Sequence, residues 1–186
     1  LNKDAGDITL EQLNFEKQDL ESLRKGIHSS QGLILVTGPT GSGKSTTLYS
    51  ILKEVSRPHL NILTAEDPVE YELEGVGQVQ IKDDIGFTFA KALRSFLRQD
   101  PEIILVGEMR DLETVSLALT AAETGHLVFG TLHTSGAPNT INRIIDVFPP
   151  EQQAQIRAQI SSSLKMVVTQ RLLKTKDGQG RCAHRP

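Results

Sequence analysis

Short apolar runs alternate with longer amphipathic stretches along most of this chain, from residue 32 onward. A run of four to eight apolar residues bounded by turn residues is typical of a buried strand, and four such runs lie at 33–37, 61–66, 103–106 and 127–132. The segment 76–81 alternates its side chains and predicts a strand at a sheet edge. Buried strands that alternate with helices predict a mostly parallel α/β sheet with helices on both faces.

Apolar residues spaced three or four apart predict the helices between these strands, among them 17–28, 44–55 and 137–147. Two more are predicted to begin after the capping residues Thr88 and Asp111, and Gly125 is predicted to end the second of them. Pro149 and Pro150 are predicted to open a last helix, whose apolar side carries Ile156, Ile160, Leu164 and Val167. After it, residues 175–180 predict a turn or loop.

The composition narrows the classes of function. The chain has 186 residues and a formal net charge of −3, which predicts one compact domain and argues against a dedicated nucleic-acid binder. An aromatic content of 4%, with no Trp, removes base stacking from the expected mechanisms. The single cysteine, Cys182, excludes an internal disulfide and a four-cysteine zinc site. No apolar run has the roughly 20 residues of a membrane span and no signal peptide precedes the domain, so we expect a soluble, intracellular protein.

The segment Gly38–Ser45 matches the phosphate-loop pattern G-x-x-x-x-G-K-[ST] in full, between a predicted strand and a predicted helix. Its glycines allow successive N–H groups to face an anion, and the helix N-terminus adds partial positive charge. Lys44 is expected to reach the β- and γ-phosphates, and Ser45 to supply a hydroxyl ligand for Mg²⁺. The predicted nucleotide-binding residues are Gly38, Pro39, Thr40, Gly41, Ser42, Gly43, Lys44, Ser45 and Thr46.

Acidic residues follow two of the predicted strands. Glu108 comes after the apolar run 103–106 and Gly107, where an acid holds Mg²⁺ or its water in P-loop ATPases. Glu66, Asp67 and Glu70 lie at the end of another strand, where a carboxylate could polarise the attacking water. Taken alone, this second cluster is more typical of an ordinary turn, because turns are rich in acidic residues.

Histidines and arginines complete the candidate residues. His126 and His133 bracket the predicted strand 127–132, and their separation along an extended strand is too large for one shared metal ion. His133, at the carboxyl end of that strand, is placed to sense the γ-phosphate. Arg94 and Arg98 form an i,i+4 pair that is either a surface pair or a source of phosphate contacts across a subunit boundary, and Arg110 follows the acidic strand end.

Taken together, these motifs resemble the secretion ATPase family that drives type II secretion and type IV pilus assembly or retraction. The resemblance covers about residues 8–184: Gly38–Thr46 resembles the Walker A loop, Thr64–Glu70 the Asp box, Gly107–Asp111 an atypical Walker B motif, and Thr124–Thr134 the His box. It implies a RecA-like P-loop NTPase that uses ATP and Mg²⁺.

The resemblance also implies roles. Lys44 and two acids would be catalytic, with Glu66 polarising the water and Glu108 associated with Mg²⁺ together with Ser45. His126, His133, Arg94, Arg98 and Arg110 would act as sensor or interface residues. The protein would be an ATP-hydrolysing motor that moves pilin or pseudopilin subunits, works as a hexameric ring, and meets an inner-membrane platform protein. It would be cytoplasmic and peripherally associated with the bacterial inner membrane, with no direct contact to nucleic acid.

By the same resemblance, residues 1–31 are an interdomain linker with a short helix, 32–174 the ATPase core, and 175–186 a truncated C-terminal segment. The absent N-terminal domain and the end at Pro186 suggest a fragment, in which turnover is weak. Residues 118–131 and 146–149 resemble retraction motors, whereas 64–67 and 94–101 resemble extension and secretion motors. Those motors usually carry a four-cysteine metal module, which a chain with one cysteine lacks, so the retraction type is preferred. A conjugation-type or DNA-translocating ATPase, and a nucleotide-binding module with little turnover, remain alternatives.

Overall fold

Six parallel strands form a single sheet in the computed structural model, which describes residues 7–174 and 181–184. Their order across the sheet is β3-β2-β4-β5-β1-β6. The strands are β1 (Gly32–Thr37), β2 (Ile62–Glu66), β3 (Val76–Gln80), β4 (Ile103–Val106), β5 (Leu127–Leu132) and β6 (Leu164–Thr169). A separate antiparallel pair follows, made of β7 (Arg171–Lys174) and β8 (Arg181–His184). The five strands predicted from the sequence are confirmed, and β3 lies at one edge of the sheet.

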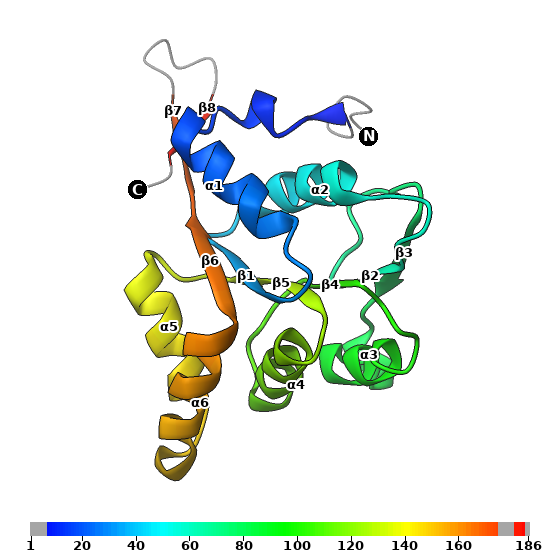
Figure 1. Ribbon diagram of the computed structural model, residues 1–186, viewed down its shortest axis with the longest axis vertical. Helices are drawn as coiled ribbons and strands as arrows, with labels where there is room; N and C mark the ends of the chain where they lie inside the picture. The colour runs from blue at the N-terminus through cyan, green and yellow to red at the C-terminus, as the bar shows by residue number, and fades with distance from the viewer. Residues whose placement is uncertain (1–6, 175–180, 185–186) are drawn as a thin grey trace.

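Six α-helices cover the sheet on both faces, which confirms the α/β class. Helices α1 and α2 lie on one face, and α3, α4, α5 and α6 lie on the other (Figure 1). The helices are α1 (Lys17–Ile27), α2 (Lys44–Val55), α3 (Phe89–Phe96), α4 (Leu112–Glu123), α5 (Ala137–Asp146) and α6 (Pro150–Ser163), and two short 3-10 helices are η2 (Glu11–Leu13) and η3 (Asp83–Ile85). In the part of the chain that the structure describes, no helix is long and apolar enough to cross a membrane.

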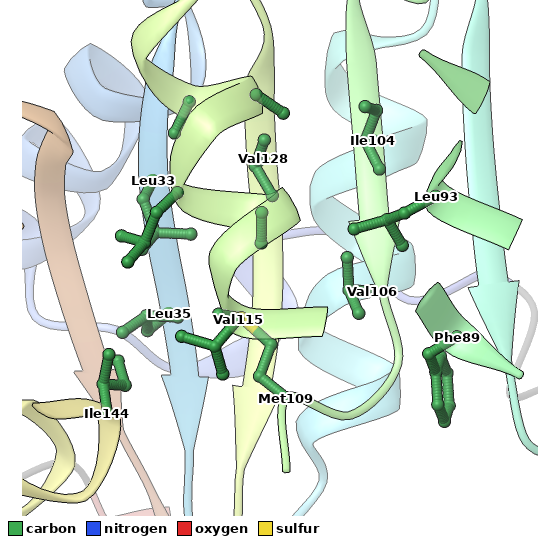
Figure 2. Packing of buried hydrophobic residues seen from close by; sticks show 14 of the residues in the cluster. Leu33, Leu35, Phe89, Leu93, Ile104, Val106, Met109, Val115, Val128 and Ile144 are labelled. Atoms are coloured by element: carbon green, nitrogen blue, oxygen red, sulfur yellow. The ribbon is translucent and has the colours of Figure 1, made fainter. Parts of the chain in front are cut away.

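The central strands are apolar on both faces because each face is covered. In β1, Leu33 and Leu35 belong to the core under α3–α6, whereas Ile34 and Val36 belong to the core under α1 and α2. All four are fully buried, as expected when successive side chains of a strand point to opposite faces. Figure 2 shows the first of these cores, in which Leu33 and Leu35 of β1 lie beside Val115 of α4.

The end of the last helix was predicted wrongly. The sequence predicts that Leu164 and Val167 continue the helical stripe, but α6 ends at Ser163 and both residues lie in β6, paired with β1. The β-branched residues Val167, Val168 and Thr169 favour the strand. The pairing of β6 with β1 shifts register between Leu33 and Ile34, so that two residues three apart, Leu164 and Val167, pack against the same core. Because of this irregularity, the buried apolar residues of β6 have a spacing that is also typical of a helix.

Two other sequence predictions concern segments that the structure does not fully describe. The loop at 175–180 lies outside the described residues, as do positions 1–6 of the linker. The strands β7 and β8 on either side of 175–180 pair with each other, a pairing that the sequence does not predict.

The N-cap of α4 gives a first testable expectation. Asp111 accepts hydrogen bonds from the Thr114 backbone N–H at 2.9 Å and from the Thr114 hydroxyl at 2.7 Å. We expect Asp111→Ala to lower the free energy of unfolding by about 1 kcal/mol, measured by urea denaturation, because the first turn loses its cap. Asp111→Asn keeps a capping oxygen and should stay within about 0.5 kcal/mol of the unsubstituted chain. Equal losses for both variants would show that the cap is not the cause.

Candidate functional site

The segment between β1 and α2 folds as a tight loop that needs its glycines. Gly38, Gly41 and Gly43 have φ values of 150°, 76° and 87°, in the region that favours glycine. At Gly38 the space is also closed, since a Cβ there would lie 2.3 Å from the carbonyl oxygen of Gln170. The loop leads directly into α2, so the N-terminus of that helix opens at the loop. The predicted strand–loop–helix context of the phosphate loop is confirmed.

Lys44 folds back over this loop. Its ammonium donates to the carbonyl oxygen of Gly38 at 2.7 Å and to that of Pro39 at 3.0 Å. Burial lowers the pKa of Lys44, and the charge of Glu108 opposes that shift. Partial burial makes the protonated form of Lys44 less favourable, and a negative charge placed nearby offsets this cost. The ammonium is therefore a favourable site for an anion.

A chain of polar contacts leads from Lys44 to the acidic end of β4. The Lys44 ammonium lies 3.4 Å from Nδ1 of His133, and Nε2 of His133 lies 3.3 Å from Oε1 of Glu108. Oε2 of Glu108 lies 3.4 Å from Arg110, which pairs with Asp83 at 2.9 Å. A neutral imidazole that accepts at Nδ1 from Lys44 and donates from Nε2 to Glu108 satisfies both contacts. His133 therefore links the phosphate loop to Glu108.

Lys44, His133 and Glu108 line one cleft of about 940 Å³ at the carboxyl ends of β1, β2, β4 and β5. Ligands of open parallel sheets bind outside the carboxyl ends of the strands, so the position is the one expected for an α/β protein. From the predicted set, the structure brings together Thr40, Gly41, Gly43, Lys44, Ser45, Thr46, Glu66, Glu108 and His133 as residues that line the cleft.

Glu66 lies at the buried end of β2, where its carboxylate is held by three side chains. Tyr49 and Thr64 donate their hydroxyl protons to it, the latter at 2.6 Å, and the Gln78 amide donates at 3.1 Å. Glu66 is only 5% exposed, and burial raises the pKa of Tyr49, so that its hydroxyl keeps its proton. One acceptor direction of Oε2 remains for a further donor. Glu70 also lines the cleft but is exposed.

The structure does not bring every candidate to the cleft. Arg94 is half-exposed on α3 and pairs with Glu113 of α4. Arg98 lies exposed just after α3. His126 precedes β5, at the opposite end of the sheet, where its Nδ1 lies 3.1 Å from the carbonyl oxygen of Ala121. None of these three lines the cleft. Among the described contacts, Arg110 is the candidate arginine that reaches a predicted site residue, Glu108, although Arg110 itself does not line the cleft.

Three side chains that support the cleft were missed from the sequence: the buried Tyr49 and the partly buried Gln78 around Glu66, and the buried Gln170 behind the phosphate loop. Tyr49 lies in a predicted helix, at a position where the sequence indicates an ordinary core residue. Gln170 follows a strand that the sequence assigns to a helix. The only available signal was a polar residue, Gln170, directly after an apolar run.

The residues present fit a nucleoside phosphate with Mg²⁺. The Ser42 hydroxyl is 2% exposed and has no hydrogen-bond partner within the described residues, an unused polar group inside the loop. Ser45, in the first turn of α2, and Glu108 both line the cleft, and both carry side-chain oxygen atoms of the kind that Mg²⁺ binds. Over residues 7–174 and 181–184 no three His, Cys, Asp or Glu residues form a metal cluster. Two protein oxygens suit Mg²⁺, which is bound through one or two side chains plus phosphate and water.

Comparison with known proteins gives consistent matches. The family model described as Type II/IV secretion system protein matches residues 1–184. The type IV pilus retraction ATPase PilT of Pseudomonas aeruginosa is 52% identical over 182 residues, 95% of this chain and 51% of that protein. The type IV pilus assembly ATPase PilB of Myxococcus xanthus is 47% identical over 175 residues, 94% of this chain and 30% of that protein. A crystal structure of the pilus retraction motor PilT with bound ADP has a TM-score of 0.86 and 48% identity, covering 96% of this chain and 52% of that one.

The chain thus spans about half the length, or less, of these similar proteins. The likeness to PilT extends over the whole parallel sheet and its helices, which confirms the RecA-like P-loop architecture expected from the sequence. With a family model matching nearly every residue, the chain belongs to the type II/IV secretion system protein family.

Proposed function

We propose that this chain is the ATP-binding and ATP-hydrolysing core of a motor for a type IV pilus or type II secretion system. One observation carries the proposal: the phosphate loop faces Glu108 across a single cleft, and His133 joins Lys44 to Glu108 at 3.4 and 3.3 Å. A loop of this kind binds the phosphates of a nucleotide, and an opposing carboxylate is the further element that hydrolysis needs. The ADP in the similar PilT structure supports a nucleotide at this loop.

The residues would divide the reaction between them. The loop N–H groups and Lys44 bind the phosphates, and Ser45 and Glu108 hold Mg²⁺, directly or through water. Bound Mg²⁺ supplies neutralisation of the negative charge that develops on the phosphates. His133, in contact with both Lys44 and Glu108, would report whether the loop is occupied.

Two carboxylates compete for the role of polarising the attacking water. Glu66 is the predicted residue, but three donors hold it in place. Exposed Glu70 lines the same cleft, four residues further along the chain. Within this chain the geometry favours Glu66 as an anchor of the β2 end and leaves Glu70 as the more accessible base.

The assembly and partners follow the family. We propose a homo-oligomeric ring, a hexamer in the complete protein, in which the exposed Arg94 and Arg98 reach a neighbouring subunit, while His126 has a structural role. An inner-membrane platform protein would be the partner, with the motor on the cytoplasmic side. The 52% identity to a retraction ATPase, against 47% to an assembly ATPase, supports retraction as the direction of work.

Removal of the metal tests this function. With ATP and Mg²⁺ the chain is expected to release inorganic phosphate, and excess EDTA is expected to reduce that rate to background because charge neutralisation at the phosphates is lost. ADP binding should persist in EDTA, since the loop and Lys44 need no metal to bind phosphate. Phosphate release that continues unchanged in EDTA would contradict the proposal. ADP binding with no phosphate release in Mg²⁺ would instead favour a nucleotide-binding module without turnover.

A further inference from the structure

A buried glutamine holds the phosphate loop from behind. Gln170 lies between β6 and β7 and is 1% exposed. Its backbone N–H donates to the carbonyl oxygen of Thr37 at 2.9 Å, which ties it to the last residue of β1. Its side-chain amide donates to the carbonyl oxygen of Ser42 at 2.8 Å, and its Oε1 accepts from the Thr47 hydroxyl at 2.8 Å. One side chain thus contacts both the loop and the first turns of α2.

The contact with Ser42 fixes the orientation of one peptide unit of the loop. A trans peptide is planar, so its C=O and N–H point in opposite directions. Since the Ser42 carbonyl points at Gln170, the N–H of Gly43 points away from Gln170, and Gly43 lines the cleft. Gly43 has a φ of 87°, which permits this orientation. A Cβ at Gly43 would lie 3.2 Å from the Gln170 amide nitrogen, so the two residues are in close contact.

The contact with Thr47 fixes the helix that the loop opens. Thr47 is 1% exposed, and its backbone N–H donates to the carbonyl oxygen of Gly43 at 3.0 Å. Gln170 therefore binds the two ends of the segment Ser42–Thr47, which includes Lys44. The nitrogen and the oxygen of the buried Gln170 amide each have a hydrogen-bond partner, and losing either partner would cost free energy. Few other conformations of the loop would keep both hydrogen bonds.

We propose that Gln170 is a positioning residue that keeps the phosphate loop in its anion-binding conformation before nucleotide arrives. The inference rests on the proposed nucleotide-binding function. When only a fraction of the molecules has the conformation that binds a ligand, the apparent affinity for that ligand is reduced by that fraction. Without Gln170 the Ser42–Gly43 peptide is free to rotate, and the competent loop becomes a minor conformer. We therefore expect replacement of Gln170 to weaken phosphate binding, and not only to destabilise the fold.

The test is titration calorimetry of the chain with ADP and with inorganic pyrophosphate, comparing Gln170→Met with the unsubstituted chain. Methionine keeps the length of the side chain and removes both hydrogen bonds. We expect both ligands to bind about tenfold more weakly, equivalent to about 1.4 kcal/mol. The matched control is Thr169→Val, the neighbouring buried residue, whose hydroxyl lies 3.0 Å from the hydroxyl of Thr37, the last residue of β1. It should alter thermal unfolding while leaving both affinities within about twofold.

A second variant keeps the inference testable if Gln170→Met does not fold. Thr47→Val removes only the hydroxyl that binds Oε1 of Gln170, and should weaken ADP about threefold. Where Gln170→Met folds, the two substitutions should be non-additive in a double-mutant cycle, because they act on one contact. Unchanged affinity in Gln170→Met, or in Thr47→Val where Gln170→Met does not fold, would overturn the positioning role alone, as would an equal loss in Thr169→Val. Failure of the unsubstituted chain to bind either ligand would overturn the proposed function with it.

Discussion

Replacing Lys44 by alanine is expected to weaken ADP binding at least 100-fold, equivalent to about 2.7 kcal/mol. The ammonium already lies over the loop, where it donates to the carbonyl oxygens of Gly38 and Pro39 at 2.7 and 3.0 Å and lies 3.4 Å from His133, and an incoming phosphate would replace one of these partners. Burial lowers its pKa, which means that an incoming anion gains an interaction that water does not screen fully. Titration of the purified variant with ADP measures the effect.

Two controls separate the loss of this charge from a general change. Lys91→Ala removes an exposed lysine on α3 and should leave ADP affinity within about twofold. Lys44→Arg keeps the positive charge, but its planar fork is larger than an ammonium and should restore only part of the affinity. If Lys44→Ala binds ADP within about threefold of the unsubstituted chain, the loop is not the nucleotide site.

Replacing Glu108 by glutamine should lower the rate of MgATP hydrolysis at least about 100-fold, because the metal ion that this carboxylate would hold supplies several kcal/mol of charge stabilisation in the transition state. The carboxylate lies at the end of β4 with His133 at 3.3 Å and Arg110 at 3.4 Å, and it faces the phosphate loop across the cleft. The amide has the same shape but no charge, so it holds Mg²⁺ and its water weakly. Steady-state phosphate release at saturating MgATP measures the change.

The matched control for Glu108 is an acid of the same kind away from the cleft. Glu123, at the end of α4, bonds to Gln159 and Ser162 of α6, and Glu123→Gln should leave phosphate release within about twofold. ADP binding without Mg²⁺ should be nearly unchanged in Glu108→Gln, since that carboxylate does not touch the loop amides. A variant that hydrolyses ATP at the original rate would remove Glu108 from the mechanism.

Most of the sheet was predictable because its signals are local. Apolar runs bounded by glycine or acidic residues give β1, β2, β4 and β5, and capping side chains give the starts of α3 and α4. The strand β6 was not predictable by the same means. Its pairing with β1 is a long-range contact, and the register shift beside Leu33 gives its apolar residues a helical spacing.

The candidate site likewise has a part that the sequence predicts and a part that depends on the fold. The phosphate loop and Glu108 could be predicted because each motif lies within a few residues of one strand end. The contact of His133 with both Lys44 and Glu108 depends on β1, β4 and β5 lying side by side, which only the fold supplies. The anchoring of Glu66 by Tyr49 and Gln78, and of the loop by Gln170, joins residues 12 to 128 positions apart, for which no sequence spacing is informative.

Titration calorimetry of the unsubstituted chain with ADP tests the central claim most directly. A phosphate loop with a preformed nest predicts saturable binding of one ADP per chain, with a dissociation constant in the micromolar range, near −8 kcal/mol. Inorganic pyrophosphate should compete for the same site because it engages the same loop. Absence of saturable binding, or binding that pyrophosphate and Lys44→Ala leave unchanged, would contradict a nucleotide site at Gly38–Thr46.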